Sequence, residues 1–149
     1  MISTETVKKL REKTGFSVIE CKKALEGTGG DEAAAEEILR KRGAEIAEKK
    51  SERQTKSGLI SSYIHSNQKI GVLLQLDCET DFVAKNENFV ELSHNICLHL
   101  AAVGAQSNEE LLSQPFIKDP EKTIQNLINE TVGRLGENIQ LNRFVRFDL

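Results

Sequence analysis

The sequence predicts an α+β protein in which a three-helix module precedes a three-stranded antiparallel sheet with helices packed on one face. Apolar residues recur at helical spacing in the N-terminal part, and from Gly58 onward the spacing changes to the alternation that is typical of strands. The alternation returns between Ile139 and Leu149 and indicates a third strand. A chain of 149 residues is long enough for one such domain with a helical appendage.

Three short helices are expected within residues 1–43. Ser17 and Glu20 have the spacing of a capping box, in which each side chain accepts a hydrogen bond from the other residue's backbone, so a helix is expected to begin there. Asp31 is expected to cap the next helix, whose apolar stripe ends at Gly43. Because three helices of this length enclose only a small core, the module is expected to be marginally stable on its own.

Residues 44–57 are mostly charged and polar, and we expect them to form a linker, helical at first, to a core domain at residues 58–149. The alternation predicts an antiparallel hairpin whose second strand covers residues 70–78. Two amphipathic helices are expected after it, the second beginning at Asp119–Pro120, since proline is common at the first helical position. The C-terminal strand is expected to pair with the hairpin, although Arg143 falls outside its alternation.

The charge distribution argues against a nucleic acid partner. The net charge of −3 is made of +2 in residues 1–56 and −5 in residues 57–149, so neither part is basic enough to hold a long phosphate backbone by releasing counterions. The absence of Trp and the single Tyr leave few aromatic side chains on which bases could stack. We therefore expect no direct binding of nucleic acid.

The sequence also carries no sign of a membrane or of export. No apolar run approaches the roughly 18 residues of a membrane span. Residues 1–5 have neither an apolar nor an Arg- and Ser-rich targeting character. Three cysteines, an odd number at wide spacing, argue against a disulfide framework and for a reducing compartment. These observations predict a cytoplasmic protein with no membrane partner.

The cysteines and histidines are candidates for a nucleophile or a metal site. His94, Cys97 and His99 fall on one predicted helix, but only the first two can converge, and two ligands do not hold a structural zinc. Cys21 and Cys78 lie on apolar faces and are interpreted as small core residues. The sequence contains no nucleophile elbow, P-loop or dinucleotide fingerprint. We therefore expect no catalytic residue, no metal, no cofactor and no enzyme activity.

The stretch from Glu79 to Asn86 is the most informative part of the sequence. It follows a predicted strand and begins a helix, so Thr80 is a suitable N-cap and Asp81 lies at the positive end of that helix. Phe82 comes within two residues of the cap, where an aromatic side chain is expected to be exposed or only partly covered. Two interpretations follow: a hydrophobic staple that holds the helix on the sheet, or a loop that contacts a partner.

Residues 78–86 resemble the signature of the bacterial-type elongation factor Ts family, the nucleotide exchange factors for elongation factor Tu. Other stretches resemble this family in the same order along the chain. They are its N-terminal signature at residues 7–15 and 21–25, a segment at residues 114–120, and the end of its short forms at residues 136–139 and 143–147. Residues 16–20 depart from the usual small residues, methionine pair and aspartate.

This resemblance implies a mechanism. The family's Asp-Phe pair, here Asp81 and Phe82, enters the G domain of elongation factor Tu and disturbs the site that holds magnesium and phosphates, which loosens GDP. Thr80 and Val83 flank the pair and are expected to bind the partner with it. The exchange factor needs no catalytic group of its own.

The resemblance also implies a second contact and a homodimer. The family's N-terminal module is similar to ubiquitin-associated domains and grips another helix of the same G domain, through positions that match Arg11, Val18 and Ile19. Short members pair two chains, and here the unpaired edge of the sheet that ends in Phe147 and Leu149 is suited to pairing. The expected location is a bacterial cytosol, or a plastid that encodes its own copy.

Two other classes of function are open at this point. The module could belong to a binding protein that captures a peptide or nascent chain, and residues 1–43 would then bind the target unaided. A cysteine hydrolase would need a histidine and a cysteine in contact. The first alternative assigns no role to residues 78–86, which favours the exchange factor.

Overall fold

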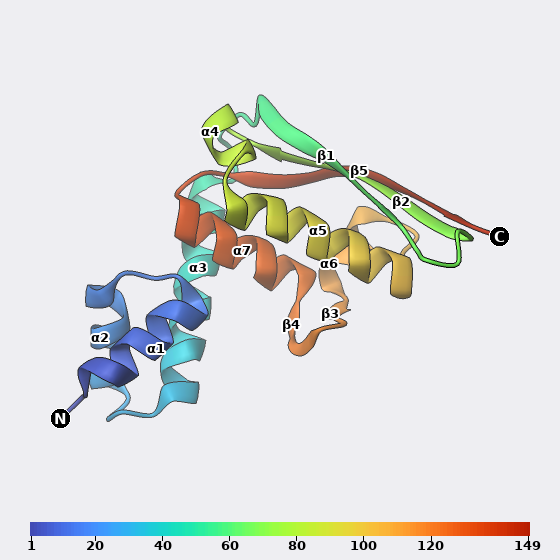
Figure 1. Ribbon diagram of the computed structural model, residues 1–149. Helices are drawn as coiled ribbons and strands as arrows, with labels where there is room; N and C mark the ends of the chain where they lie inside the picture. The colour runs from blue at the N-terminus through green and yellow to red at the C-terminus, as the bar shows by residue number, and fades with distance from the viewer.

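Three antiparallel strands form one layer of the core, and helices cover one face of that layer (Figure 1). The computed structural model describes residues 1–149. Strands β1 (Ser57–Ile64), β2 (Ile70–Cys78) and β5 (Ile139–Asp148) lie in the order β1-β2-β5. Helices α5 (Glu87–Ala102) and α7 (Ile124–Leu135) pack beneath them in Figure 1. The predicted α+β class and the pairing of the C-terminal strand with the hairpin are confirmed.

Two separate hydrophobic clusters hold the molecule together. The larger cluster has 17 buried residues, mainly from β2, α5 and α7, with Phe89 and Ile96 among the fully buried side chains. The smaller has eight buried residues, supplied by helices α1 (Thr4–Thr14), α2 (Val18–Gly27) and α3 (Glu32–Lys50) and by the α1–α2 connection. These three helices are the three-helix module, at the lower left of Figure 1.

The caps of the module differ in one detail from the prediction. Ser17 accepts a hydrogen bond from the backbone N–H of Glu20 at 3.2 Å, as expected of an N-cap. The carboxylate of Glu20 does not return to the cap but lies 3.6 Å from Nε of Arg42 on α3. Only half of the expected capping box is therefore formed, because the nearby cation on α3 attracts the glutamate.

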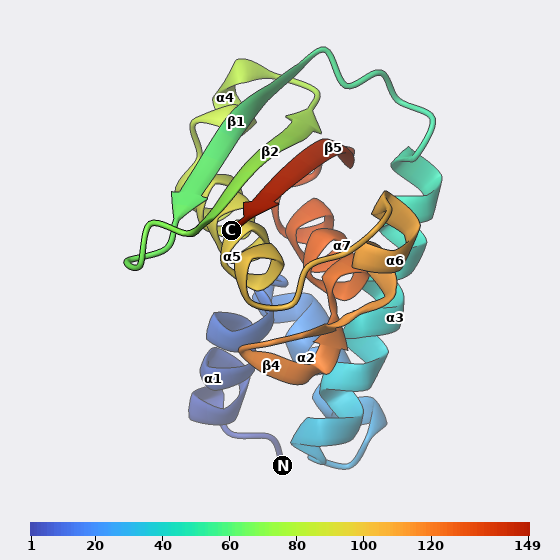
Figure 2. The ribbon, with the colours of Figure 1, turned by 90° about the vertical axis from the view of Figure 1, so that its right-hand side faces the viewer.

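The sequence predicted that the third helix ends at Gly43. In the structure α3 continues through Gly43 to Lys50. Gly43 lies where α3 crosses α7: a Cβ there would come within 3.4 Å of the carbonyl oxygen of Asn129. On the α7 side, Gly133 faces Gly43 and the ring of Phe16. Because Gly43 and Gly133 have no side chain, the module can pack closely on the core. Gly43 does not end the helix. Figure 2 shows α3 running alongside α7.

The expected helix start at Asp119–Pro120 is wrong. These residues begin strand β4 (Asp119–Thr123), which pairs with the two-residue strand β3 (Pro115–Phe116). Proline is tolerated here because the short hairpin does not require its missing N–H. Helix α7 begins after Thr123, which forms a reciprocal capping box with Asn126. The short helices α4 (Asp81–Ala84) and α6 (Asn108–Ser113) complete the fold.

A β-bulge explains why Arg143 falls outside the alternation of the last strand. Leu76 pairs with Leu141 but Gln75 pairs with Arg143, so Asn142 is an extra residue in β5. The extra residue reverses the alternation, and beyond it Val145 lies on the face of the sheet that is turned away from the helices. No helix in the structure is both long and apolar enough to cross a membrane.

Candidate partner-binding site

The turn formed by Thr80–Val83 follows the end of β2 and begins α4. The Thr80 hydroxyl accepts a hydrogen bond from the backbone N–H of Val83 at 3.4 Å, which confirms Thr80 as the N-cap. Val83 is buried in the larger cluster, whereas Phe82 is 90% exposed. Phe82 is therefore not a staple, because it covers nothing in this chain; Val83 holds the turn on the core instead.

Asp81 lies beside Phe82 at the first position of α4 and is also exposed. Its carboxylate accepts a hydrogen bond from the hydroxyl of Ser57, the first residue of β1. A carboxylate at a helix N-terminus is favoured by the positive end of the helix dipole. The structure thus presents one acidic and one aromatic side chain, adjacent and open to solvent, on a turn that is fixed to the edge of the sheet.

Glu137 is a site residue for which the sequence analysis gave no role. It lies in the connection between α7 and β5, and its carboxylate accepts hydrogen bonds from the backbone N–H groups of Glu79 at 3.1 Å and Thr80 at 3.0 Å. It also accepts a hydrogen bond from the Thr80 hydroxyl at 2.7 Å. The only signal in the sequence was that residues 136–139 resemble the end of the family's short forms, which gave no contact.

The second set of expected contact residues, Arg11, Val18 and Ile19, is exposed on the three-helix module. Val18 is 50% and Ile19 67% exposed in the first turn of α2, and Arg11 is exposed in the last turn of α1. In Figure 1, α1 and α2 lie at the lower left of the molecule, whereas α4 lies above them at its top. The structure therefore does not bring the two sets of expected contact residues together, and one partner would have to reach both.

The three thiols lack the environment of a nucleophile. Cys21, Cys78 and Cys97 are buried and unpaired. Burial raises the pKa of all three, that of Cys78 to about 11, where the negative charge of Glu137 adds to the effect. Cys78 donates a hydrogen bond to the carbonyl oxygen of Thr80 at 3.2 Å. The interpretation of Cys21 and Cys78 as core residues is confirmed.

The histidines likewise form no reactive pair with a cysteine. His99 is fully buried, and its ring bonds the side chain of Gln114 and the backbone N–H of Ile117. His94 is exposed and packs edge-on against Tyr63. No group of three or more His, Cys, Asp or Glu side chains is placed to hold a metal ion.

Comparison with known proteins agrees with the resemblance. The family model described as Elongation factor TS matches residues 79–149. Elongation factor Ts of Oleidesulfovibrio alaskensis is 40% identical, over 99% of this chain and 98% of that protein. Elongation factor Ts of Thermodesulfovibrio yellowstonii is 42% identical, over 99% of this chain and 96% of that protein. Elongation factor Ts of Aquifex aeolicus is 46% identical, over 99% of this chain and 52% of that protein.

The lengths of these alignments differ. Those with the Oleidesulfovibrio and Thermodesulfovibrio proteins span 193 and 192 residues, although this chain has 149, so both relatives contain residues without a counterpart here. The match nevertheless covers nearly the whole of this chain and includes the turn that presents Phe82. The chain therefore belongs to the elongation factor Ts family and is a translation elongation factor.

Proposed function

We propose that this protein is the guanine-nucleotide exchange factor for elongation factor Tu. The observation that carries the proposal is the exposure of Phe82. Its side chain is 90% open to solvent, although Thr80 is held by Glu137 and Val83 is buried in the larger cluster. An aromatic side chain in that setting gains little for its own fold, whereas buried aromatic anchors dominate binding energy at interfaces. The family assignment supplies the class of partner.

The proposed mechanism is linkage and not chemistry. A factor that binds the nucleotide-free form of a GTPase more tightly than the GDP-bound form must weaken GDP binding by the same ratio. In our proposal Phe82 and Asp81 enter the G domain beside the site for magnesium and phosphates, with Thr80 and Val83 behind them. The Asp81 carboxylate would add a negative charge close to the phosphates, which disfavours their binding. The factor itself would use no catalytic residue and no cofactor.

The second set of contact residues is proposed to add affinity. Arg11, Val18 and Ile19 would contact another helix of the same G domain, so that the first contact raises the effective concentration of the second. The branched side chains at positions 18 and 19 keep apolar character, but they lack the adaptability of the methionines usual in the family.

We also propose that the protein forms a homodimer through the uncovered side of the sheet. Apolar side chains of all three strands are exposed on this outer face: Ile60, Ile64, Leu73, Val145 and Phe147. Exposed apolar patches of this kind mark interaction surfaces. Sedimentation at micromolar concentration should give a mass near twice 16.6 kDa. A monomer under these conditions would contradict the proposal.

A cytoplasmic location, without nucleic acid or membrane as partner, completes the proposal. Its support is the three unpaired cysteines, which suit a reducing compartment. Reaction of the intact cellular protein with a thiol reagent after denaturation should find all three thiols reduced.

Stopped-flow release of fluorescent GDP from elongation factor Tu tests the central proposal. Adding this protein at micromolar concentration should accelerate release, and the rate should saturate with its concentration. The absence of acceleration would contradict the exchange function. If the isolated residues 1–43 bound the target as tightly as the whole chain, the peptide-capturing alternative would be favoured instead.

A further inference from the structure

The connection between α7 and β5 holds the Thr80–Val83 turn from outside. One oxygen of the Glu137 carboxylate accepts the N–H groups of Glu79 and Thr80, and the other accepts the Thr80 hydroxyl. The Thr80 hydroxyl oxygen in turn accepts the N–H of Val83. A continuous chain of hydrogen bonds therefore runs from Glu137 through the N-cap into α4.

These contacts begin where the strand pairing stops. The ladder between β2 and β5 ends at the pair Cys78–Ile139, so the amides of Glu79 and Thr80 have no backbone acceptor on β5. Both residues are partly buried, and an amide left without a partner there is costly. The Glu137 carboxylate takes the place of the missing carbonyl groups and extends the sheet contact into the turn.

The direction in which Phe82 projects depends on the hydrogen bonds of the Glu137 carboxylate. Helix α4 has four residues, which is too short to be stable without anchoring. Phe82 itself is exposed, so its own packing does not orient it. Only the groups that fix its neighbours do so: the buried Val83, the Ser57–Asp81 hydrogen bond and the Glu137 carboxylate.

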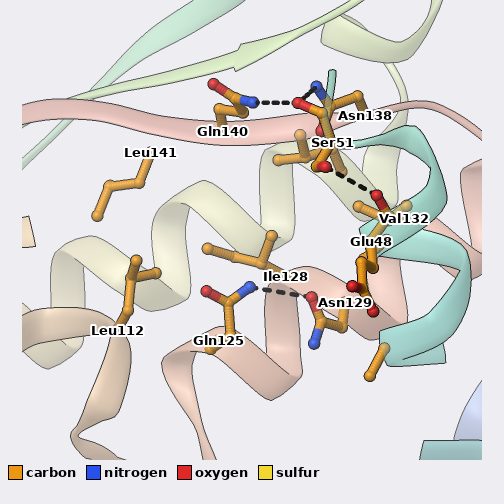
Figure 3. Close-up of a pocket in the computed structure, with 13 residues that line it drawn as sticks. Glu48, Ser51, Leu112, Gln125, Ile128, Asn129, Val132, Asn138, Gln140 and Leu141 are labelled. Carbon is orange, nitrogen blue, oxygen red and sulfur yellow. Dashed lines mark hydrogen bonds between the residues drawn. The ribbon is translucent and has the colours of Figure 1, made fainter. Parts of the chain in front are cut away.

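The same connection also contacts the end of α3. The buried Asn138, 3% exposed, donates both side-chain hydrogens, to the carbonyl oxygens of Ser51 at 3.3 Å and Arg53 at 2.8 Å. Figure 3 shows the side chain of Gln140, like that of Asn138, directed at Ser51 beside an open pocket of about 430 Å³. Adjacent residues thus hold the turn on one side and the end of the module's last helix on the other.

A second carboxylate, that of Glu79, makes the corresponding contact in the opposite direction. The carboxylate of Glu79 accepts the backbone N–H of Asn138 at 2.7 Å, and Nη1 of Arg53 lies 3.8 Å from the same oxygen. Glu79 and Glu137 therefore each accept a backbone N–H from the segment that carries the other. Two segments far apart in the sequence are joined without a continuous strand ladder.

We propose that Glu137 is a positioning residue for nucleotide exchange: its carboxylate fixes the direction in which Asp81 and Phe82 project, and so sets the maximal exchange rate. The inference rests on the proposed exchange function. Glu137 does not contact the partner in this proposal; it acts through Thr80. A loss of positioning should lower the rate at saturation more than it raises the half-saturating concentration, because the contact residues of the module still bind.

The test compares variants of the full chain. Glu137→Ala removes all three hydrogen bonds, whereas Glu137→Gln keeps an oxygen that accepts the two amides and should rescue most of the effect. Glu130→Ala is the matched control: Glu130 is also a partly buried carboxylate, but it pairs with Lys122 at 2.9 Å, away from the turn. Glu137→Ala should lower the maximal rate of GDP release about tenfold or more at temperatures where it is folded.

Two readouts do not depend on elongation factor Tu. The amides of Glu79 and Thr80 should exchange with solvent about tenfold faster in Glu137→Ala than in Glu130→Ala. Because the chain has no Trp, Phe82→Trp provides a unique fluorophore, and its anisotropy should drop when Glu137→Ala is added but not when Glu130→Ala is added. If Glu137→Ala left both readouts unchanged, the positioning role would be overturned.

The two proposals fail in different ways. If the wild-type protein did not accelerate GDP release, the exchange function would fall, and the positioning of Phe82 would still be decided by the amide exchange and the anisotropy. If the wild type accelerated release, and Glu137→Ala loosened the turn but kept the full maximal rate, only the positioning role in exchange would fall. Equal loss of rate in Glu137→Ala and Glu130→Ala would also overturn it.

Discussion

The first turns of α2 and α4 expose apolar side chains in the same local setting. Each begins after a hydroxyl cap, Ser17 in one and Thr80 in the other. The second residue after the cap is the most exposed apolar side chain of each turn, Ile19 and Phe82. A capped helix start thus places apolar side chains in solvent at two distant points of one chain.

What differs is how each turn is held. Helix α2 has ten residues, and its own buried residues pack in the cluster of the module. Helix α4 has four residues and is held by polar contacts from Ser57 and Glu137. The comparison teaches that packing orients the exposed side chains of α2, whereas the direction of Phe82 depends on hydrogen bonds in addition to the packing of Val83. Within the proposed function, binding strength would come mainly from the module and the exchange step from the α4 turn.

The largest expected effect separates the exposed Phe82 of α4 from the buried Phe89 of α5. Phe82→Ala should slow GDP release by roughly tenfold or more, since an interface anchor is commonly worth about 2 kcal/mol, and should leave the melting temperature nearly unchanged. Phe89→Ala, which removes a fully buried ring, should lower the free energy of unfolding by about 3–5 kcal/mol. Asp81→Ala should resemble Phe82→Ala. A Phe82→Ala protein that was badly destabilised but exchanged normally when folded would refute the assignment.

A smaller effect is expected from the module. The double variant Val18→Ala, Ile19→Ala should raise the half-saturating concentration several-fold, roughly 1 kcal/mol in binding, and keep the maximal rate of GDP release. Titration of the fluorescent GDP release assay measures both quantities. A fall in the maximal rate with no change in the half-saturating concentration would contradict this division of roles, because it would place the exchange step on the module.

The two caps provide the next comparison. Ser17→Ala and Thr80→Ala should each lower the free energy of unfolding by about 1 kcal/mol, because each leaves a helix N–H without its acceptor. Only Thr80→Ala should also slow GDP release, since it breaks the chain of hydrogen bonds from Glu137 to Val83. Denaturant unfolding and the release assay measure the two effects. Thr80→Ser keeps the hydroxyl and should behave like the wild type.

The sequence predicted most of the fold because its main signals are local. Alternation and caps identified β2, the start of α2 and the exposed setting of Phe82. What failed depends on contacts between distant segments. The bulge at Asn142 is visible only in the register with β2, and Gly43 continues a helix because α7 packs against it.

The role of Glu137 was out of reach for the same reason. Its hydrogen bond to Thr80 joins residues 57 positions apart, and no periodicity or cap pattern connects them. Asp119–Pro120 shows the converse, a local signal that was misleading. The residue types suit a helix start, but pairing with β3 placed them in a hairpin, and the cap at Thr123 began the helix instead.

The smallest expected effect concerns the thiols beneath the two turns. The pKa of Cys78 is raised to about 11 from an ordinary 9.0, first by burial and then by the charge of Glu137, and burial also raises the pKa of Cys21 in α2. Because the folded state holds these protons more tightly than the unfolded state, their stabilisation is complete below pH 9.0 and is lost as the pH rises, for Cys78 through about 11.

Denaturant unfolding between pH 8 and 11 measures this loss. Cys78→Ala should flatten the decline of the unfolding free energy more than Cys21→Ala does, because the charge of Glu137 is second only to burial in raising the pKa of Cys78, whereas in Cys21 a hydrogen bond with Thr14, which lowers the pKa, outweighs the charge of Glu20. Glu137→Ala should flatten it in part, since burial of Cys78 remains. Equal slopes for the two cysteine variants would show that the Glu137 charge does not reach the thiol of Cys78.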